Sequence, residues 1–169
     1  MFEKVLIANR GEIALRIHRA CHEMGIKTVA VHSTADENAM HVRLADESVC
    51  IGAPPARASY MNVPAILSAA ALTNASAIHP GYGFLSENSN FAAIIEEHGF
   101  TFIGPSPEHI QMMGNKLAAK AVLRDLGIPV VVGSEKPIVE TGEAMQIAEE
   151  IGYPILVKAA HGGGGHGMQ

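Results

Sequence analysis

The sequence has 169 residues, of which 48% are hydrophobic and 17% charged, a composition typical of a folded globular protein rather than a disordered chain. Lysine and arginine total 12 against 17 aspartates and glutamates, and the resulting net charge of -5 argues against a general binder of nucleic acid or acidic membranes, which needs a basic surface. No apolar stretch approaches the roughly 18 residues that cross a bilayer, and no signal-peptide pattern follows Met1. Cys21 and Cys50 form no CxxC pair, which fits buried thiols in a reducing compartment. We therefore expect a cytoplasmic protein with no membrane or nucleic-acid partner.

The first two-thirds of the chain alternate between strand and helix patterns. Residues 4–8 (KVLIA) form a short apolar run typical of a buried parallel strand. A helix is expected next, with Ile13, Ile17, Ala20 and Met24 on its buried apolar face. Further strands are expected at 27–32, 49–51, 77–79 and 100–103, with helices at 64–72 and 90–98. This order predicts an α/β fold with a doubly wound, mostly parallel sheet.

The rest of the chain shows a different organisation. Ser106 and Pro107 predict the start of a helix, and further helices are expected at 116–126 and 142–151. A strand is expected at 155–159, and four consecutive glycines follow at 162–165. Because a compact domain rarely ends on such a run, we expect a structural unit that is cut short. The predicted organisation is a domain at 1–113, a helical linker at 114–130 and an incomplete unit at 131–169.

The turn at residues 9–12 (NRGE) follows the first expected strand and opens the first helix. The dinucleotide motif GxGxxG is absent, since only Gly11 is present, and this argues against NAD binding. A helix N-terminus favours anions, and Arg10 would add positive charge. Anion binding and an ordinary strand–helix turn with a solvent-facing arginine both fit the sequence.

The glycine run carries the strongest chemical signal. Lys158 closes the last expected strand, and residues 161–167 (HGGGGHG) follow it. Glycines allow backbone N–H groups to approach phosphate oxygens, while a nearby ammonium neutralises their charge. The pattern is not a Walker motif, because no Gly-Lys-Ser/Thr ends it. A phosphate-binding loop is predicted, with a glycine-rich linker as the alternative.

The first helix carries two patterns with alternative interpretations. His18 and His22 have a spacing that can bind a metal, but no third ligand is evident, so we expect both on a solvated face and predict no metal site. A local ion-pair ladder or a subunit contact would each explain four charged residues along one flank. These residues are Glu12, Arg16, Arg19 and Glu23.

The loop at residues 79–88 (HPGYGFLSEN) is rich in groups that bind ligands, and it follows an expected strand. In doubly wound folds, ligands bind at the carboxyl ends of strands. Tyr82 would face such a ligand or belong to the core, and Glu87 would contact the ligand or act as an acid near a helix N-terminus. The residues alone leave these alternatives open.

Four motifs together resemble those of biotin carboxylases, which are ATP-grasp ligases. They are residues 7–14 (IANRGEIA), 79–88, 102–105 (FIGP), and Lys158-Ala159 before the glycine run. The resemblance covers essentially the whole chain. It implies that residues 1–113 are the pre-ATP-grasp domain and 131–169 the truncated start of the ATP-grasp lid domain.

Within the family, the resemblance favours the biotin carboxylase subunit of bacterial acetyl-CoA carboxylase. The alternatives are the corresponding parts of propionyl-CoA or pyruvate carboxylases, another ATP-grasp ligase such as a carbamoyl-phosphate enzyme, and a non-catalytic dimerisation fragment.

The resemblance implies a ligase for the first half-reaction of acetyl-CoA carboxylase, in fatty acid synthesis. ATP phosphorylates bicarbonate to carboxyphosphate, and biotin bound to a carrier protein takes up the CO₂. The implied partners are the biotin carboxyl carrier protein, the carboxyltransferase subunits and a second copy in a homodimer. The family's Mg²⁺ ligands, bicarbonate site and catalytic base lie beyond residue 169, so no catalytic residue or metal ligand is expected here, and the chain alone is expected to be inactive.

The resemblance also assigns roles to individual positions. Lys116 and Lys158 match the family's ATP-contacting lysines in this half, Tyr82 matches a residue near the biotin side, and Arg19 and Glu23 match the homodimer contact. The ATP-covering lid loop corresponds to Gly162, Gly163, Gly164, Gly165, His166 and Gly167.

Three positions depart from the family pattern. Asn115 stands where the family usually has Asp, and His166 and Gln169 stand where basic residues are common. Because histidine is largely neutral at pH 7, we expect the loop to bind phosphates more weakly than a relative with arginine at residue 166.

Overall fold

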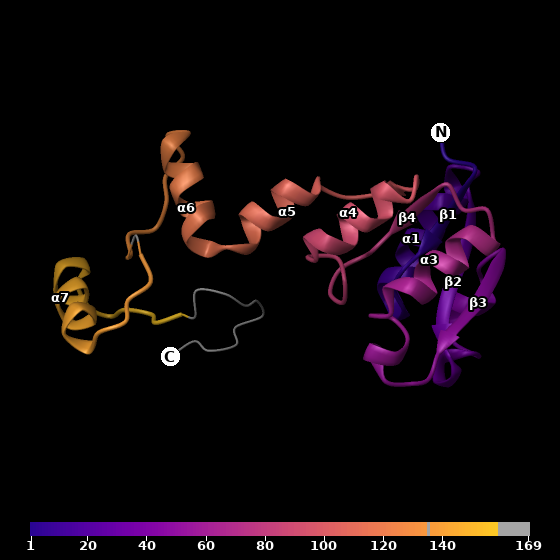
Figure 1. Cartoon of the computed structure of the whole chain (residues 1–169), viewed down its shortest axis with the longest axis horizontal. Coiled ribbons are helices and arrows are strands. Elements are labelled where there is room, and N and C mark those ends of the chain that lie inside the picture. Colours follow the sequence, from indigo (N-terminus) through magenta and orange to yellow (C-terminus); the bar gives the residue numbers. More distant parts are fainter. Residues whose placement is uncertain (135, 159–169) are drawn as a thin grey trace. The chain divides into compact units, whose positions relative to one another are not determined.

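The computed structural model describes residues 1–134 and 136–158 of the chain (Figure 1). The chain divides into two compact units, Met1–Ile110 and Gln111–Gln169, and the boundary falls within helix α5 (Pro107–Gly114). Among the described residues, no helix is both long and apolar enough to cross a membrane.

The first unit contains a five-stranded sheet in which every neighbouring pair of strands is parallel. The order of the strands is β3-β2-β1-β4-β5, so the chain begins in the centre, winds to one edge and then crosses β1 to build the other half. This confirms the predicted doubly wound α/β fold, and the strand order reverses between β1 and β4. The strands are β1 (Lys4–Ile7), β2 (Lys27–Ser33), β3 (Glu47–Gly52), β4 (Ala77–His79) and β5 (Thr101–Phe102).

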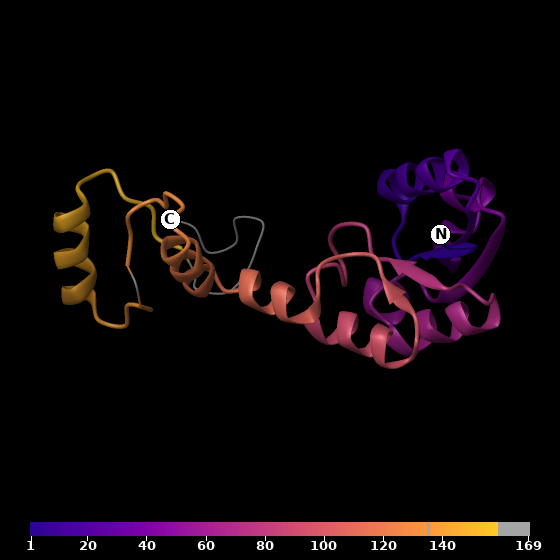
Figure 2. The same cartoon turned by 90° about the horizontal axis from the view of Figure 1, so that it is seen from above.

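Helices cover both faces of this sheet. Alternate side chains of β1 point to opposite faces: Leu6 joins one hydrophobic core, and Val5 and Ile7 join the other. Figure 2 shows the indigo helix α1 on one side of the strands and the magenta helices on the other. The helices of the unit are α1 (Gly11–Glu23), α2 (Met40–Arg43), α3 (Val63–Leu72) and α4 (Ser89–Glu97), with short 3-10 turns η1 (Thr34–Asp36) and η2 (Ala56–Ala58).

Asparagine side chains begin two of these helices. Asn62 accepts a hydrogen bond from the Ala65 N–H at the start of α3, and Asn88 accepts one from the Phe91 N–H at the start of α4. Each side chain satisfies an N–H group that has no partner within the helix. The second cap also fixes where the loop at 79–88 ends.

The regular elements in the described part of the second unit are helices, with α6 (Lys116–Asp125) and α7 (Thr141–Ile151) following the end of α5. The strand predicted at 155–159 is wrong for residues 155–158, which form no regular element, and Ala159 lies outside the described residues. Ile155, Leu156 and Val157 are 37%, 58% and 60% exposed. An apolar run becomes a strand only when a neighbour satisfies its backbone, and the described part of this unit contains no other strand.

Three expectations about burial are also wrong. His18 is 7% exposed, and its Nδ1 lies 2.7 Å from the Thr28 Oγ1, whereas Met24 is 58% exposed. The buried stripe of α1 therefore includes His18, because Ala14, Ile17 and Cys21 define its centre. Cys50, on the edge strand β3, is exposed rather than buried.

Two buried histidines, His18 and His41, and the half-buried His79 predict a pH-dependent stability. Burial lowers the pKa of His18, His41 and His79 below the ordinary value. Below about pH 6.5 the unfolded chain therefore binds protons that the folded chain does not. The contribution of these histidines to the free energy of unfolding is fully present above that pH and is lost as the pH drops. Each histidine adds at most about 1.4 kcal/mol per pH unit. Urea unfolding from pH 7.5 to 5.5 measures the slope.

The substitution His18→Asn should flatten this slope. The control is His22→Asn, at an exposed position on the same helix. Equal flattening in the two variants, or stability that rises on acidification, would contradict the argument.

The capping geometry of α6 makes a second prediction. Asn115 Oδ1 accepts hydrogen bonds from the N–H groups of Leu117 and Ala118, at 3.0 and 3.1 Å. Asn115→Asp keeps this acceptor and adds a negative charge at a helix N-terminus, so stability should hold or rise slightly. Asn115→Ala should cost about 1 kcal/mol in the unfolding transition of this unit, measured by circular dichroism in urea. A loss in the aspartate variant equal to that in the alanine variant would refute the capping role.

Candidate functional site

The carboxyl ends of β1, β2 and β4 meet at one edge of the first unit's sheet, because all its strands are parallel. In doubly wound folds this edge binds ligands, next to the point where the strand order reverses. Here that point lies between β1 and β4. The turn at 9–12 follows β1, and the loop at 79–88 begins at the end of β4.

Asn9 joins these two segments across the reversal point. Its side chain is buried, and Nδ2 donates hydrogen bonds to the carbonyl oxygens of Pro80 and Tyr82, at 2.7 and 2.8 Å. Its Oδ1 accepts from the Arg10 N–H at 2.9 Å. Gly81 has φ +67, and a Cβ there would lie 2.8 Å from Asn9 Nδ2, so glycine is required for both reasons. The crevice between the two strands is therefore closed by protein hydrogen bonds.

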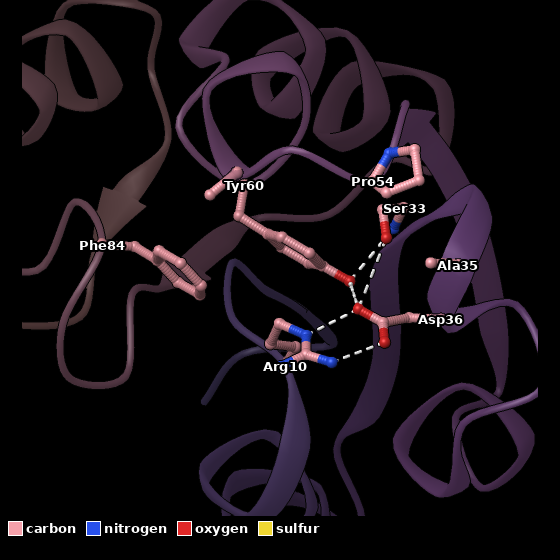
Figure 3. Close-up of a pocket in the computed structure, with 8 residues that line it drawn as sticks. Arg10, Ser33, Ala35, Asp36, Pro54, Tyr60 and Phe84 are labelled. Carbon is pink, nitrogen blue, oxygen red and sulfur yellow. Dashed lines mark hydrogen bonds and ion pairs between the residues drawn. The ribbon is translucent and has the colours of Figure 1, made fainter.

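Arg10 forms an ion pair with Asp36 instead of facing solvent alone. Its Nε and Nη2 donate to Oδ2 and Oδ1 of Asp36, each at 2.6 Å, so both oxygens of the carboxylate are engaged (Figure 3). Paired N–H···O bonds of this kind fix orientation as well as charge. Asp36 ends the short turn that follows β2, and the ion pair thus links the segments after β1 and β2.

Asp36 also accepts hydrogen bonds from the Tyr60 hydroxyl, at 2.6 Å, and from the Ser33 hydroxyl, at 3.4 Å. The Tyr60 oxygen in turn accepts from the Ser33 N–H at 3.0 Å. The hydrogen bond from Arg10, followed by that from Tyr60, holds the pKa of Asp36 well below its usual range. Burial, together with the Asp36 bond, raises the pKa of Tyr60. Near neutral pH the group is therefore an ionised carboxylate beside a neutral phenol.

A hollow of about 290 Å³ lies beside this network (Figure 3). The Phe84 ring stacks on the Tyr60 ring, with centroids 5.3 Å apart and planes inclined by 12°. Figure 3 shows Arg10, Asp36 and Tyr60 directing their polar atoms toward one another. The network therefore shapes the walls of the hollow. Its lining consists of Arg10, Ser33, Ala35, Asp36, Pro54, Ala56, Tyr60 and Phe84.

Tyr82 is the predicted biotin-side residue, and it lies on the surface of the first unit. Its side chain is 59% exposed, which excludes the alternative that it belongs to the core. Its hydroxyl donates to Glu12 Oε1 at 2.7 Å, and this hydrogen bond raises the pKa of Tyr82. Glu12 lies in the first turn of α1. The exposed phenol is thus tied to the same turn that holds the backbone of its loop.

Arg19 and Glu23, the predicted dimer residues, are both exposed on α1. The ion-pair ladder is not formed: in the described part of the chain, no ion pair within 4.0 Å connects any two of the four charged residues on this flank. Glu12 contacts Tyr82 instead. The subunit contact stays a prediction.

The predicted nucleotide residues belong to the second unit. Lys116 is the first residue of α6, directly after its Asn115 cap, and Lys158 is exposed. The predicted phosphate loop, residues 162–167, lies outside the described residues. Within residues 1–134 and 136–158, no cluster of three or more histidine, cysteine, aspartate or glutamate side chains is arranged to hold a metal.

Sequence reasoning did not identify Asn9, Asp36 or Tyr60 as parts of one site. Asp36 and Tyr60 are separated by 24 residues and lie on different connections, so no periodic pattern relates them. One sequence signal was available, since an asparagine that ends a buried strand at a tight turn is placed to bond backbone groups nearby. Its partner loop, 71 residues away, is brought there only by the crossover to β4.

Two protein families match the chain in succession. The family described as "Biotin carboxylase, N-terminal domain" matches residues 1–110, and the one described as "Carbamoyl-phosphate synthase L chain, ATP binding domain" matches residues 115–169. The first match covers the unit that contains the sheet and the network around Asp36.

Curated and solved relatives cover the chain throughout. A biotin carboxylase of Pseudomonas aeruginosa is 62% identical over 100% of this chain. The crystal structure of a Campylobacter jejuni biotin carboxylase in a beta-gamma-ATP complex superposes with a TM-score of 0.95 at 49% identity, covering 100% of this chain and 38% of its own.

A third relative is the biotin carboxylase domain dimer of the Hydrogenobacter thermophilus 2-oxoglutarate carboxylase, in complex with MgADP, ADP and bicarbonate. It has a TM-score of 0.93 and 50% identity, and covers 100% of this chain and 37% of its own. The chain spans about 38% of the length of the curated Pseudomonas relative. With the first family matched over residues 1–110 and these relatives matched from end to end, the chain belongs to the biotin carboxylase family.

Proposed function

We propose that this chain is the N-terminal part of a biotin carboxylase, the ATP-dependent ligase that carboxylates biotin with bicarbonate. The observation that carries the proposal is the 62% identity to the Pseudomonas aeruginosa biotin carboxylase over the whole chain. In this proposal residues 1–169 provide the first domain and the start of the ATP-binding domain. The remaining catalytic groups come from sequence that corresponds to the other part of that relative.

The proposed cofactor set is ATP, Mg²⁺ and bicarbonate, with biotin on a carrier protein as the acceptor. The bound MgADP, ADP and bicarbonate of the Hydrogenobacter structure support this set. The donor chemistry of the chain fits a nucleotide, since two lysine ammonium groups and a run of glycine N–H groups suit phosphate oxygens. Lys116, Lys158 and the loop at 162–167 are the proposed ATP residues. The Mg²⁺ ligands and the catalytic residues are proposed to lie outside the chain.

The residues of this chain contribute binding and orientation. Phosphoryl transfer depends mainly on positioning and on stabilising charge around the phosphates, and magnesium supplies part of that charge when it is bound. Lys116 and Lys158 neutralise phosphate charge, while glycine N–H groups accommodate the oxygens at close range. Tyr82 presents its phenol on the biotin side.

The proposed domain organisation keeps a domain at 1–113, a helical linker at 114–130 and the start of the ATP-grasp lid domain at 131–169. The division between Ile110 and Gln111 and the helix α6 support it, as do the family matches at 1–110 and 115–169. The proposed partners are the biotin carboxyl carrier protein, the carboxyltransferase subunits and a second copy of the chain.

A chimaera tests the activity. Residues 1–169 joined to the C-terminal remainder of the Pseudomonas aeruginosa relative should release ADP in a reaction that needs both free biotin and bicarbonate. The 169-residue chain alone should show none above background. A folded chimaera without biotin-dependent turnover, or a chain that turns over alone, would refute the proposal.

Within the same chimaera, Lys116→Gln and Lys158→Gln should each raise the KM for ATP about tenfold or more, because each removes a charge-assisted contact of roughly 1.5–3 kcal/mol. Lys120→Gln, one helical turn after Lys116, is the matched control and should change it less than twofold.

The homodimer is tested by charge reversal on α1. Arg19→Glu in the chimaera should shift the sedimentation coefficient toward that of a monomer, because the substitution places like charges at the proposed contact. Arg57→Glu, at an exposed position on η2, is the control. A dimer that survives Arg19→Glu as well as it survives Arg57→Glu would contradict the assignment.

A further inference from the structure

We propose that the turn at residues 9–12 positions the loop at 79–88, with Asn9 and Glu12 as positioning residues for the Tyr82 phenol. The inference rests on the proposed function in one respect only, the placement of Tyr82 on the biotin side. The contacts that hold the loop belong entirely to the first unit.

The first contact fixes the loop's backbone. One buried amide nitrogen of Asn9 donates to two carbonyls of the loop, those of Pro80 and Tyr82, at 2.7 and 2.8 Å. The same side chain is itself oriented by the bond from the Arg10 N–H to its Oδ1. Because the amide cannot rotate without losing all three bonds, the backbone of Tyr82 is held at a fixed place relative to β1. A substitution that removes the two donors leaves the buried carbonyl of Pro80 and the partly buried carbonyl of Tyr82 without this partner.

The second contact fixes the Tyr82 side chain. The side chain is 59% exposed, so the hydroxyl bond to Glu12 Oε1 at 2.7 Å is the contact that holds its direction. Glu12 itself is carried by the first turn of α1, a rigid element that packs on the sheet. A phenol that is already oriented for binding loses less conformational freedom when a ligand binds.

The third contact holds the far side of the loop. Phe84 has φ +44, a left-handed conformation that is uncommon for a bulky residue and is maintained only where the surroundings impose it. Its ring stacks on Tyr60, whose hydroxyl is bound to Asp36, and Asp36 is held by Arg10. The chain of contacts thus returns to the same turn.

Three residues of one four-residue turn therefore constrain three different parts of one loop. Asn9 holds the backbone before and at Tyr82, Glu12 holds its hydroxyl, and Arg10 acts through two residues on Phe84. A binding group displaced by even 1 Å loses much of its effect, so support of this kind bears on affinity for the ligand that Tyr82 meets. Nucleotide binding, which is proposed for the second unit, should be unaffected.

A double-mutant cycle in the chimaera tests the side-chain contact. Glu12→Ala and Tyr82→Phe should each raise the KM for free biotin about threefold to tenfold, as expected for one exposed hydrogen bond, with the KM for ATP changed less than twofold. Because Glu12 acts through the hydroxyl, the double variant should be no worse than either single one. Glu12→Gln keeps an oxygen acceptor and should restore the KM to within about twofold.

Glu97→Ala, at an exposed position on α4, is the matched control and should leave both constants unchanged. Additive losses in the double variant, or equal changes in the two KM values, would overturn the positioning role of Glu12.

Hydrogen exchange on the 169-residue chain tests the backbone contact without any activity. Asn9→Asp keeps the shape but replaces the two donors with a carboxylate oxygen, so the amides of Ser86 and Asn88, which are bonded within the loop, should exchange at least about tenfold faster. Thr28→Val is the control. It removes two side-chain hydrogen bonds of a buried residue near the amino end of β2, away from the carboxyl ends where the loop lies.

Equal exchange of the loop amides in the two variants would overturn the role of Asn9. If the chimaera is inactive while Asn9→Asp still frees the loop, the proposed function fails and the positioning of the loop stands.

Discussion

The hydrogen bonds of Asn9 across the reversal point of the sheet are the constraint on which the rest of this edge depends. A doubly wound sheet separates the connections after its two central strands and leaves a crevice between them. Here a single buried side chain fills that place by donating to Pro80 and Tyr82. The segment after β1 and the loop after β4 consequently behave as one surface, and Gly81 is needed because any side chain there would displace the amide.

Electrostatics extend this surface toward β2 and β3. Asp36 is ionised because Arg10 and Tyr60 both donate to it, and the ion pair in turn holds the Tyr60 ring where Phe84 stacks on it. Such a pair contributes little to stability when it is isolated on a surface. Its value here is geometric, because it joins three segments that are distant in sequence: Arg10 after β1, the turn at residues 33–36, and Tyr60. The fold thus uses charge to fix loops, while the hydrophobic cores on the two faces fix the sheet.

The two units differ in how their structure is supported. The first has a core on each face of its sheet and capped helices that define where its loops begin and end. The described part of the second has helices and an apolar run at 155–158 that forms no strand. The proposed division of labour follows this difference. The first unit offers a rigid edge suited to orienting a small acceptor, and the second carries the lysines and glycines suited to phosphates.

Much of the fold was predictable because its signals are local. Short apolar runs, helical spacing and turn residues gave the parallel strands and most helices, and motif spacing identified the family. The predicted strand is wrong for residues 155–158 because a strand depends on a neighbour that a local pattern cannot supply. His18 was predicted on the solvated face of α1 because the buried face was inferred from Ile13 and Met24. The face that packs on the sheet is instead centred on Ala14 and Ile17, and it includes His18.

By itself the sequence determined the doubly wound class and the family, since both depend on residue type and local order, and the resemblance to that family proposed Tyr82, Lys116 and Lys158 as site residues. Only the tertiary structure decided that Asn9 meets the loop 71 residues later, that Arg10 is paired with Asp36, and that Tyr82 is held by Glu12. These contacts arise when parallel strands bring the ends of separate connections to one edge. No local pattern in the chain records which side chains will meet there.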